Sequence, residues 1–588
     1  MWRAKINFSL APWRRSPYEL LTEPRQLVTS TIAARLRMML FFAIAVSTGI
    51  MLQFFLFGFP SSRTYGEPFT FKPEPPIFHE SCGVSDVSKG YVRPGFGNAI
   101  FPYEDAWTLL RIKTMVSRTK GYLAHDYPLP LGWNDIRYII ESGMLAGLVL
   151  NRTLIIPSFL YARSCVFSHA VCELYAIQHH GSEDFGSPSG EKQQAWTIPI
   201  ELMVDLPRLR AAHPVVTVAE YLHLHGLPIS IERLNGRWDN ESYLATKPHP
   251  VSFTSLKQNE YEPDGVVRVD YGITKPRDPY HNKPISSALD AGLGEAKTID
   301  LDKVKLTLQE KQLAKWSSEE ELERLLHANG WTFLYTFRGM TVTEPLTQVA
   351  KISQVRGLYN ELASRYEEVL LLEGVIQQNI KPGFLMFGSD KTRKTFVWLV
   401  TQGVQPIAPV RLLAERLVHK LRSMNDGRQF MSADMRRGDP AISPPMDYTE
   451  ARISRVKNRL RRGLKLVQEL SHLPPQTANM TDIPSDENLK GAPPLETDKF
   501  FVLTDERSPE VLEQMRKEGA VTIQDLIREE DRRLLGWPML FDDAVAQVEQ
   551  LIASYSVFFY GHPTSSLAGD VVNLRAARGF DLRTSVFD

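Results

Sequence analysis

Two arginines, a glycine and an aspartate directly follow a short apolar run at residues 430–434, in the order Arg436-Arg437-Gly438-Asp439. The run predicts a buried strand, and ligands of open α/β sheets bind beyond the carboxyl ends of the strands. Arginine is the side chain best suited to grip a phosphate with two parallel hydrogen bonds. The stretch therefore indicates a phosphate-binding turn, and the alternative is an exposed charged turn that binds nothing.

Two later strands are also predicted to end in polar residues. One is followed by Thr504-Asp505-Glu506, and the other leads to Thr564-Ser565-Ser566 at the start of the last helix. Hydroxyl groups and unpaired N–H groups at a helix start suit a diphosphate, and Asp505 is placed to hydrogen-bond a base or a ribose. Since Arg436 would neutralise the β-phosphate as it leaves, these residues predict a site for a nucleotide-sugar whose leaving group is a nucleoside diphosphate.

A glycine turn opens a helix earlier in the chain. Gly132-Trp133-Asn134-Asp135 precedes apolar residues at helical spacing, and the run Thr153–Ile156 predicts the strand that follows. Asn134 is predicted to cap the helix, and its place at a helix start suits an anion or a sugar-nucleotide. No motif identifies a carboxylate as the catalytic base. Asp135 and Glu141 are the candidates, and an ordinary helix position is the alternative for each.

Strands and helices alternate along much of the chain, which is typical of parallel, Rossmann-like sheets. The sequence therefore predicts an α/β protein with an acceptor-side domain over residues 121–400 and a nucleotide-sugar-binding domain over 401–588. Residues 60–120 are rich in proline, glycine and aromatic residues and are expected to form a stem. Charged residues make up 23% of the chain and the formal net charge is zero, which argues against a general nucleic-acid binder.

An uncharged apolar segment occupies residues 38–59. As a helix it would span ~33 Å, which matches the hydrocarbon core of a bilayer. Basic residues concentrated in residues 1–37 favour a cytosolic tail. We therefore expect a single-pass type II membrane protein of the Golgi apparatus or endoplasmic reticulum with a lumenal catalytic part, and a cleaved signal peptide is the alternative. The glycosylation sequons at Asn240 and Asn479 fit that compartment.

The sequence contains three cysteines, of which Cys165 and Cys172 lie close together. They are candidates for a small loop disulfide, and two buried thiols are the alternative. The histidines of Leu222-His-Leu-His225 lack a third ligand at a usual spacing, so no metal site is predicted, and the alternation fits a strand instead. Asp300-Leu-Asp302 has the Asp-x-Asp pattern of metal-dependent glycosyltransferases, but no apolar strand precedes it and it is interpreted as surface.

Together these stretches resemble the motifs of the GDP-fucose protein O-fucosyltransferase superfamily. Gly132 to Arg137 with Asn151 to Pro157 is similar to the family's glycine/asparagine turn, helix and Asn-Arg-Thr-Leu strand. Asp434-Met-Arg436-Arg437-Gly438-Asp439 resembles its His-x-Arg-Arg-Gly-Asp motif, and Thr504-Asp505 resembles its strand-end Thr-Asp. Gly561 to Ala568 resembles its terminal Gly-Thr-x-x-Ser-Ser-Phe-Ser segment. The resemblance thus covers most of the expected lumenal part.

The resemblance implies a GT-B fold, in which two Rossmann-like domains face each other across a cleft. It implies metal-independent, inverting transfer of fucose from GDP-fucose, or from another nucleotide-sugar, to a protein or glycan acceptor, without a further cofactor. By position in the motifs, Arg436 is expected to bind the β-phosphate, and Ser565 and Ser566 are expected to bind the diphosphate. Asp505 is expected to contact the nucleoside, and Asn134 the donor or the acceptor. Asp434, Asp439 and Thr564 complete the expected donor site.

One residue departs from the family pattern, because Asp434 stands where the family has His. An acid close to the nucleotide repels phosphate, so the departure allows a different donor or a loss of activity. The alternative function is therefore an inactive, membrane-anchored protein of the transferase fold that binds sugars or serves as a scaffold.

Overall fold

The computed structural model describes residues 106–128, 131–162, 164–167, 171–172, 197–232, 234–236, 252–276, 282–374, 380–436, 450–477, 491–563 and 565–587. All of them belong to the unit Ile77–Asp588. Within these ranges no helix combines the length and the apolar character that a membrane span requires. The segment 38–59 and the sequons Asn240 and Asn479 lie outside the described residues.

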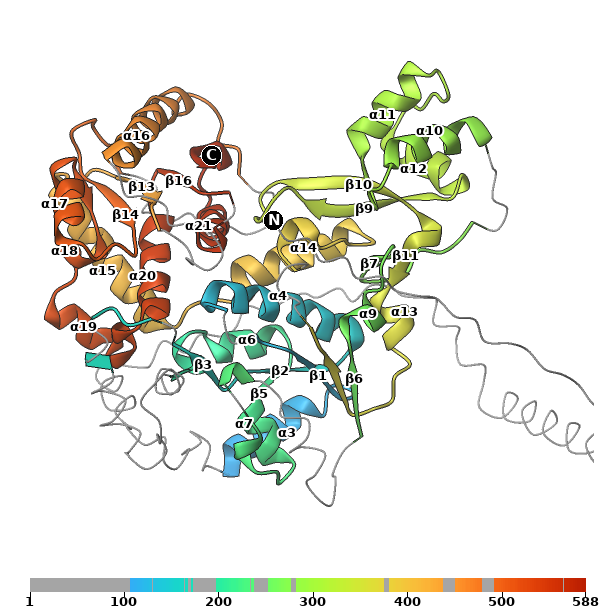
Figure 1. Cartoon of the computed structure of the whole chain (residues 1–588), viewed down its shortest axis with the longest axis horizontal. Helices are drawn as coiled ribbons and strands as arrows, with labels where there is room; N and C mark the ends of the chain where they lie inside the picture. The colour runs from blue at the N-terminus through green and yellow to red at the C-terminus, as the bar shows by residue number, and fades with distance from the viewer. Residues whose placement is uncertain are drawn as a thin grey trace, which may run out of the picture. The chain divides into compact units, whose positions relative to one another are not determined.

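The first half is built on a five-stranded parallel sheet. Its strand order is β5 (Val215–Thr217), β2 (Thr153–Ile156), β1 (Tyr122–His125), β12 (Val369–Leu372) and β6 (Phe253–Leu256). Every residue of β1, β2 and β12 is buried, as parallel sheets require when helices cover both faces. Helix α4 (Trp133–Leu150) packs on one face, and α3 (Ala106–Val116) and α7 (Val218–Leu224) pack on the other (Figure 1).

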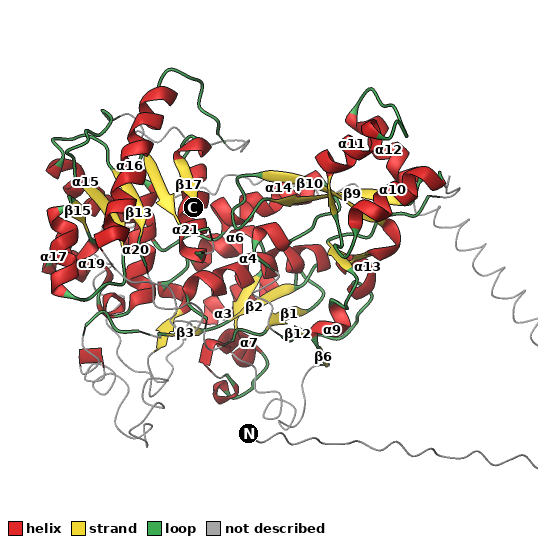
Figure 2. Cartoon of the chain, turned by 45° about the horizontal axis from the view of Figure 1, so that its top comes forward, coloured by secondary structure: helices red, strands yellow, loops and turns green. Residues whose placement is uncertain are grey.

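The second half repeats this plan with another five-stranded parallel sheet. Its order is β15 (Ala520–Val521), β14 (Phe500–Leu503), β13 (Met431–Asp434), β16 (Phe558–Gly561) and β17 (Ser585–Phe587). Helix α16 (Glu450–Leu470) covers one face, and α20 (Asp542–Ser554) covers the other together with α15 (Ala408–Met424). Helix α21 (Ser566–Ala577) follows β16, and Figure 2 shows helices beside the strands of both sheets. The predicted α/β class with parallel sheets is confirmed.

An additional module is inserted before β12. A three-stranded antiparallel sheet, in the order β8 (Ile299–Asp300), β10 (Pro345–Lys351) and β9 (Trp331–Phe337), packs with α10 (Lys283–Leu293), α11 (Leu301–Glu310) and α12 (Glu319–Ala328) around a core of its own. The short strands β7 (Val267–Val269) and β11 (Val355–Gly357) pair beside it. Other described elements are β3 (Phe159–Tyr161), β4 (Thr197–Pro199), α6 (Leu206–Ala212), α9 (Gln258–Tyr261), α13 (Leu358–Leu362), α14 (Asp390–Trp398), α17 (Pro509–Lys517), α18 (Ile523–Leu526) and α19 (Glu529–Leu535).

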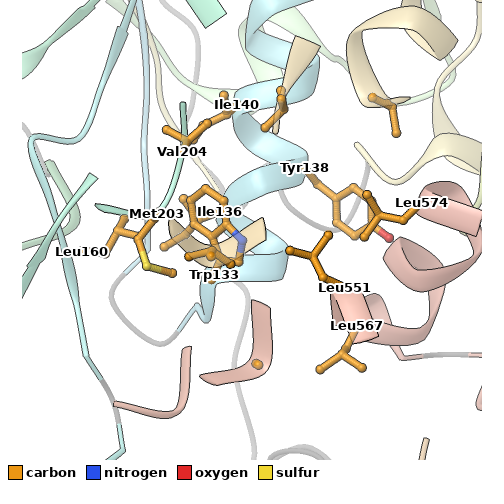
Figure 3. Close-up of a cluster of buried hydrophobic side chains, with 14 of the residues drawn as sticks. Trp133, Ile136, Tyr138, Ile140, Leu160, Met203, Val204, Leu551, Leu567 and Leu574 are labelled. Atoms are coloured by element: carbon orange, nitrogen blue, oxygen red, sulfur yellow. The ribbon is translucent and has the colours of Figure 1, made fainter. Parts of the chain in front are cut away.

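One hydrophobic core runs through both halves. Side chains of α4 meet side chains of α20 and α21 in a single buried cluster. Figure 3 shows Tyr138 of α4 directed toward Leu551 of α20 and Leu574 of α21, while Trp133 and Met203 lie together on the other side of α4. The core therefore fixes the start of α4 against the last two helices of the chain.

Three local predictions need correction or comment. Helix α4 begins after Gly132 rather than with Asn134 as its cap. Its first N–H group, that of Trp133, donates to Oδ1 of Asp543 at 3.0 Å, so a distant carboxylate takes the place of the expected local cap. The Leu222–His225 stretch ends helix α7 instead of forming a strand. Asp300 caps α11, since its Oδ1 accepts the N–H of Asp302 at 2.9 Å.

Candidate functional site

Helix α20 connects two of the predicted site residues. Residues Ala544 to Ser554 of this helix are all buried, and a buried charge is tolerated only when it is paired. Glu549, which is fully buried, accepts a hydrogen bond from Nη2 of Arg436. The next residue, Gln550, donates through Nε2 to Oδ1 of Asn134 at 2.7 Å. Two residues from opposite halves are thus bonded to consecutive positions of one rigid helix.

Asp434 connects the end of β13 to the start of α21. This residue is 7% exposed. Its Oδ1 accepts the backbone N–H of Arg436 at 3.0 Å, and its Oδ2 accepts the hydroxyl of Ser565 at 2.8 Å. Ser565 in turn caps α21, because its Oγ accepts the N–H of Ala568 at 3.1 Å. The turn with the arginine and the helix start with the serines therefore form one site.

The charges of this site are arranged around Arg436. Burial alone would lower the pKa of its guanidinium, but the carboxylates of Glu549, Asp542 and Asp505 raise the pKa above the ordinary value. Arg436 therefore stays cationic. Its side chain is 19% exposed, and its Nε atom has no hydrogen-bond partner among the residues that the structure describes. Among the described residues, Glu549 holds the guanidinium through Nη2, and the exposed part of the side chain is available to a ligand.

The two buried acids beside Arg436 are strongly affected by desolvation. Burial raises the pKa of Glu549 to about 7, although Arg436 opposes the shift. Burial also raises the pKa of Asp434, against the hydrogen bonds from Arg436 and Ser565. Both oxygens of Asp434 are engaged inside the protein. Asp434, which stands where the resembled motif has histidine, is thus a structural bridge between the end of β13 and the start of α21.

Asp505 lies in the loop after β14, which pairs directly with β13. It is half-buried, and its carboxylate contributes to the raised pKa of Arg436. Glu506 shapes this loop, because its Oε1 accepts the N–H groups of Arg507 and Ser508, both at 2.8 Å. The predicted nucleoside contact therefore lies at the same sheet edge as the phosphate turn.

The two candidate bases on α4 have different environments. Asp135 is half-buried in the first turn. Glu141 is 1% exposed and accepts a hydrogen bond from Nε of Arg137 at 2.7 Å. Arg137 also pairs with Asp570 of α21 and donates to the carbonyl of Val400 at 3.0 Å. Burial raises the pKa of Glu141 to about 7, opposed by Arg137. Glu141 thus belongs to a buried ionic network between α4 and α21, and Asp135 is the more accessible carboxylate.

The loop closed by Cys165 and Cys172 packs against the second half. These residues form a disulfide, which was one of the two alternatives that the sequence left open. The N–H of Val166 donates to the carbonyl of Leu540 at 2.7 Å, and Arg507 donates to the carbonyl of Val166. Arg507 follows the β14 loop directly, so the disulfide loop supports one side of the site.

Sequence reasoning missed the polar residues of α20. Gln547, Glu549 and Gln550 lie in α20, for which the sequence suggested no part in the site, and Gln547 donates to the carbonyl of Met203 at 2.8 Å. Three polar residues inside an apolar run could have indicated them. A helix that is apolar on all sides is buried, so polar side chains within it need hydrogen-bond partners.

Of the remaining predicted residues, only some lie among those that the structure describes. Ser566 is the first residue of α21 and is half-buried. Arg437, Asp439 and Thr564 lie outside the described residues. No group of three or more potential metal ligands occurs in the part of the chain that the structure describes.

Comparisons with known proteins give limited similarity. No family model matches the chain. No curated protein matches its sequence. A crystal structure of POFUT1 in complex with GDP-fucose is similar with a TM-score of 0.28 and 12% identity, over 80% of this chain and 98% of that chain. A crystal structure of POFUT1 in complex with GDP has a TM-score of 0.30 and 12% identity, over 80% of this chain and 98% of that chain. Both TM-scores are low.

Proposed function

We propose that the chain is a glycosyltransferase of the GT-B type, which transfers fucose from GDP-fucose to a protein or glycan acceptor with inversion and without a metal ion. One observation carries the proposal. Arg436 is a partly buried cation at the carboxyl end of β13, held by Glu549 and joined through Asp434 and Ser565 to the start of α21. A guanidinium beside a helix N-terminus at the edge of a parallel sheet is suited to a diphosphate. The motif resemblance supports fucose as the transferred sugar.

The leaving group is stabilised by fixed positive groups. As the bond between fucose C1 and the β-phosphate oxygen breaks, negative charge develops on GDP, and Arg436 neutralises it. The N–H groups of Ser566 and Leu567 have no intrahelical acceptor in the first turn of α21 and would donate to the same anion. The hydroxyl of Ser565 already donates to Asp434, so this serine shapes the turn while its neighbours bind the phosphate.

The acceptor side is formed by the start of α4. Gln550 fixes the amide of Asn134, which orients a hydroxyl of donor or acceptor. In the proposed step the acceptor oxygen attacks C1 from the side opposite to GDP, its proton passes to Asp135, and the configuration at C1 inverts. The apolar segment at 38–59 would anchor the enzyme as a type II protein of the Golgi apparatus or endoplasmic reticulum.

Nucleotide binding tests this proposal directly. The full-length chain is melted with GDP, GDP-fucose or UDP. A ligand at 100 times its Kd stabilises the folded state by about 2.7 kcal/mol, so GDP and GDP-fucose should raise Tm while UDP does not. Arg436→Ala should abolish the shift. Arg461→Ala is the matched control, because Arg461 is an exposed arginine paired with Glu496 on the surface.

The outcomes separate the candidate functions. Release of GDP from GDP-fucose in the presence of an acceptor supports the transferase. GDP-selective binding without release supports an inactive sugar-nucleotide-binding protein. If none of the nucleotides changes Tm, or if Arg436→Ala responds as the unmodified chain does, the donor site is refuted.

A further inference from the structure

A pocket of about 500 Å³ opens at the amino ends of the strands of the first sheet. Its lining includes residues that immediately precede strands, namely Gly121 before β1, Ser252 before β6 and Glu368 before β12. Asn134 follows the opposite, carboxyl end of β1. The pocket and the proposed donor site therefore lie at opposite edges of this sheet, and the pocket has no part in the site described above.

An aromatic and polar wall forms the inner side of the pocket. Tyr122 is 6% exposed. Its ring packs edge-on against Tyr221 with centroids 4.8 Å apart, and against His225 with centroids 5.5 Å apart. The Tyr122 hydroxyl is 3.3 Å from Nε2 of His225, and the same nitrogen is 3.9 Å from Oε1 of Glu368. Packing thus fixes a hydroxyl, an imidazole and a carboxylate along one wall.

Tyr366 stands at the rim of this pocket and is 88% exposed. A single exposed aromatic residue is ordinary on a protein surface. Here the ring lies beside a concave wall with convergent polar groups, which is the usual composition of a small-molecule site. The face of the ring is available for stacking, and tyrosine offers a large contact area with little loss of side-chain freedom.

The charged residues that line the pocket are Lys113, Lys120 and Glu368. The ammonium group of Lys120 donates to the carbonyl of Ala363, and burial lowers its pKa. The buried guanidinium beneath the pocket, that of Arg152, donates to the backbone carbonyls of Arg365 at 2.8 Å and Glu367 at 2.9 Å. Burial lowers the pKa of His225, so this ring is neutral near pH 7. The carboxylate of Glu368 remains as a strong acceptor.

We propose that this pocket binds a neutral oligosaccharide, with one sugar ring stacked on Tyr366 and sugar hydroxyls hydrogen-bonded to Glu368 and His225. Sugar rings have an apolar face that packs on an aromatic ring, and hydroxyl groups at their edge that donate to carboxylates. The volume lies within the range of ~300–1,000 Å³ that is usual for small-molecule pockets. The chain would then carry a carbohydrate-binding site separate from its donor site.

The test uses isothermal titration of the full-length chain with cellotetraose, mannotetraose and chitotetraose as neutral probes and tetragalacturonate as an anionic probe. We expect saturable binding of at least one neutral tetrasaccharide. Tyr366→Ala should weaken that binding at least tenfold, and Tyr366→Phe should retain it within twofold, because the ring face is kept. Glu368→Gln should also weaken it. Tyr359→Ala is the control, since Tyr359 is a 44% exposed tyrosine of α13 that does not line the pocket.

Three results would overturn the proposal. The first is the absence of binding by all three neutral probes. The second is equal binding by the chain with Tyr366→Ala. The third is a preference for tetragalacturonate that is lost on Lys113→Ala, because it would assign the pocket to an anion. Arg436→Ala should leave oligosaccharide binding unchanged, so failure of the donor site and failure of this pocket are told apart.

Discussion

The hydrogen bond from Ser565 to Asp434 can be measured by a double-mutant cycle. It joins the end of β13 to the cap of α21 and so connects two stretches that the sequence placed in the donor site. The cycle consists of Asp434→Ala, Ser565→Ala and the double variant in the full-length chain. If the bond is made in solution, the two substitutions are not additive, because each of them removes the same interaction.

The expected magnitude follows from the contacts. A hydrogen bond to a charged group contributes about 1.5–3 kcal/mol, and we take about 1.5–2 kcal/mol for this bond because it is only partly buried. Ser565→Ala also removes a helix cap worth about 1 kcal/mol. Asp434→Ala also removes the acceptor of the Arg436 N–H, worth about 1 kcal/mol. Each single variant should lose about 2.5–3 kcal/mol, the double variant about 3.5–4, and the coupling free energy should be about 1.5–2 kcal/mol.

The assay is equilibrium unfolding in urea, followed by tryptophan fluorescence and by far-ultraviolet circular dichroism. Coincidence of the two curves is required before free energies of unfolding are compared. Ser508→Ala is a matched control, because Ser508 occupies the cap position of α17 without a side-chain capping bond. It should change stability by less than about 0.5 kcal/mol. A coupling free energy below about 0.5 kcal/mol, or a Ser565→Ala variant as stable as Ser508→Ala, would refute the bridge.

Three further predictions concern stability. Burial raises the pKa of Glu232 to about 8, so its stabilising contribution is present below about pH 4 and is lost as the pH rises through 8. Glu232→Gln should therefore raise Tm at pH 9 but not at pH 4. If the substitution changes Tm equally at both pH values, this prediction is contradicted. Arg137→Ala leaves Asp570 buried without its cation, which should cost about 3–5 kcal/mol in thermal unfolding, and an unaltered Tm would disprove the network. Cys172→Ser opens the small loop closed with Cys165 and should lower the free energy of unfolding by about 2.5 kcal/mol, whereas an unshifted urea midpoint without reductant would show that the loop adds no stability.

Local patterns were sufficient for the elements that carry the site. The runs before Asp434 and Thr504 are strands, a helix follows the turn at Gly132, and the last helix starts at Ser566. Buried strands and helices of this kind leave strong periodic signals, because hydrophobic packing selects one residue type at each repeat. The order of the strands that end in polar residues could therefore be predicted from the sequence alone.

Local patterns failed where a distant group decided the outcome. Asn134 was expected to cap α4, but Asp543 supplies the acceptor from another part of the chain. The alternating histidines suggested a strand, whereas the capping box of Thr217 and Glu220 starts a helix over the same residues. Such effects depend on partners that sequence spacing alone does not identify.

The contacts of α4 with α20 and α21 also bear on the order in which the chain is made. Arg137 is synthesised 433 residues before its partner Asp570. At roughly 5–20 residues per second, translation needs about 20–90 s to supply that carboxylate. During this time the first half lacks one of the two carboxylates that pair with Arg137, and it lacks the helices that cover one side of α4. In a nascent chain the buried ionic network and the cover of α4 are therefore completed only when the last helices emerge.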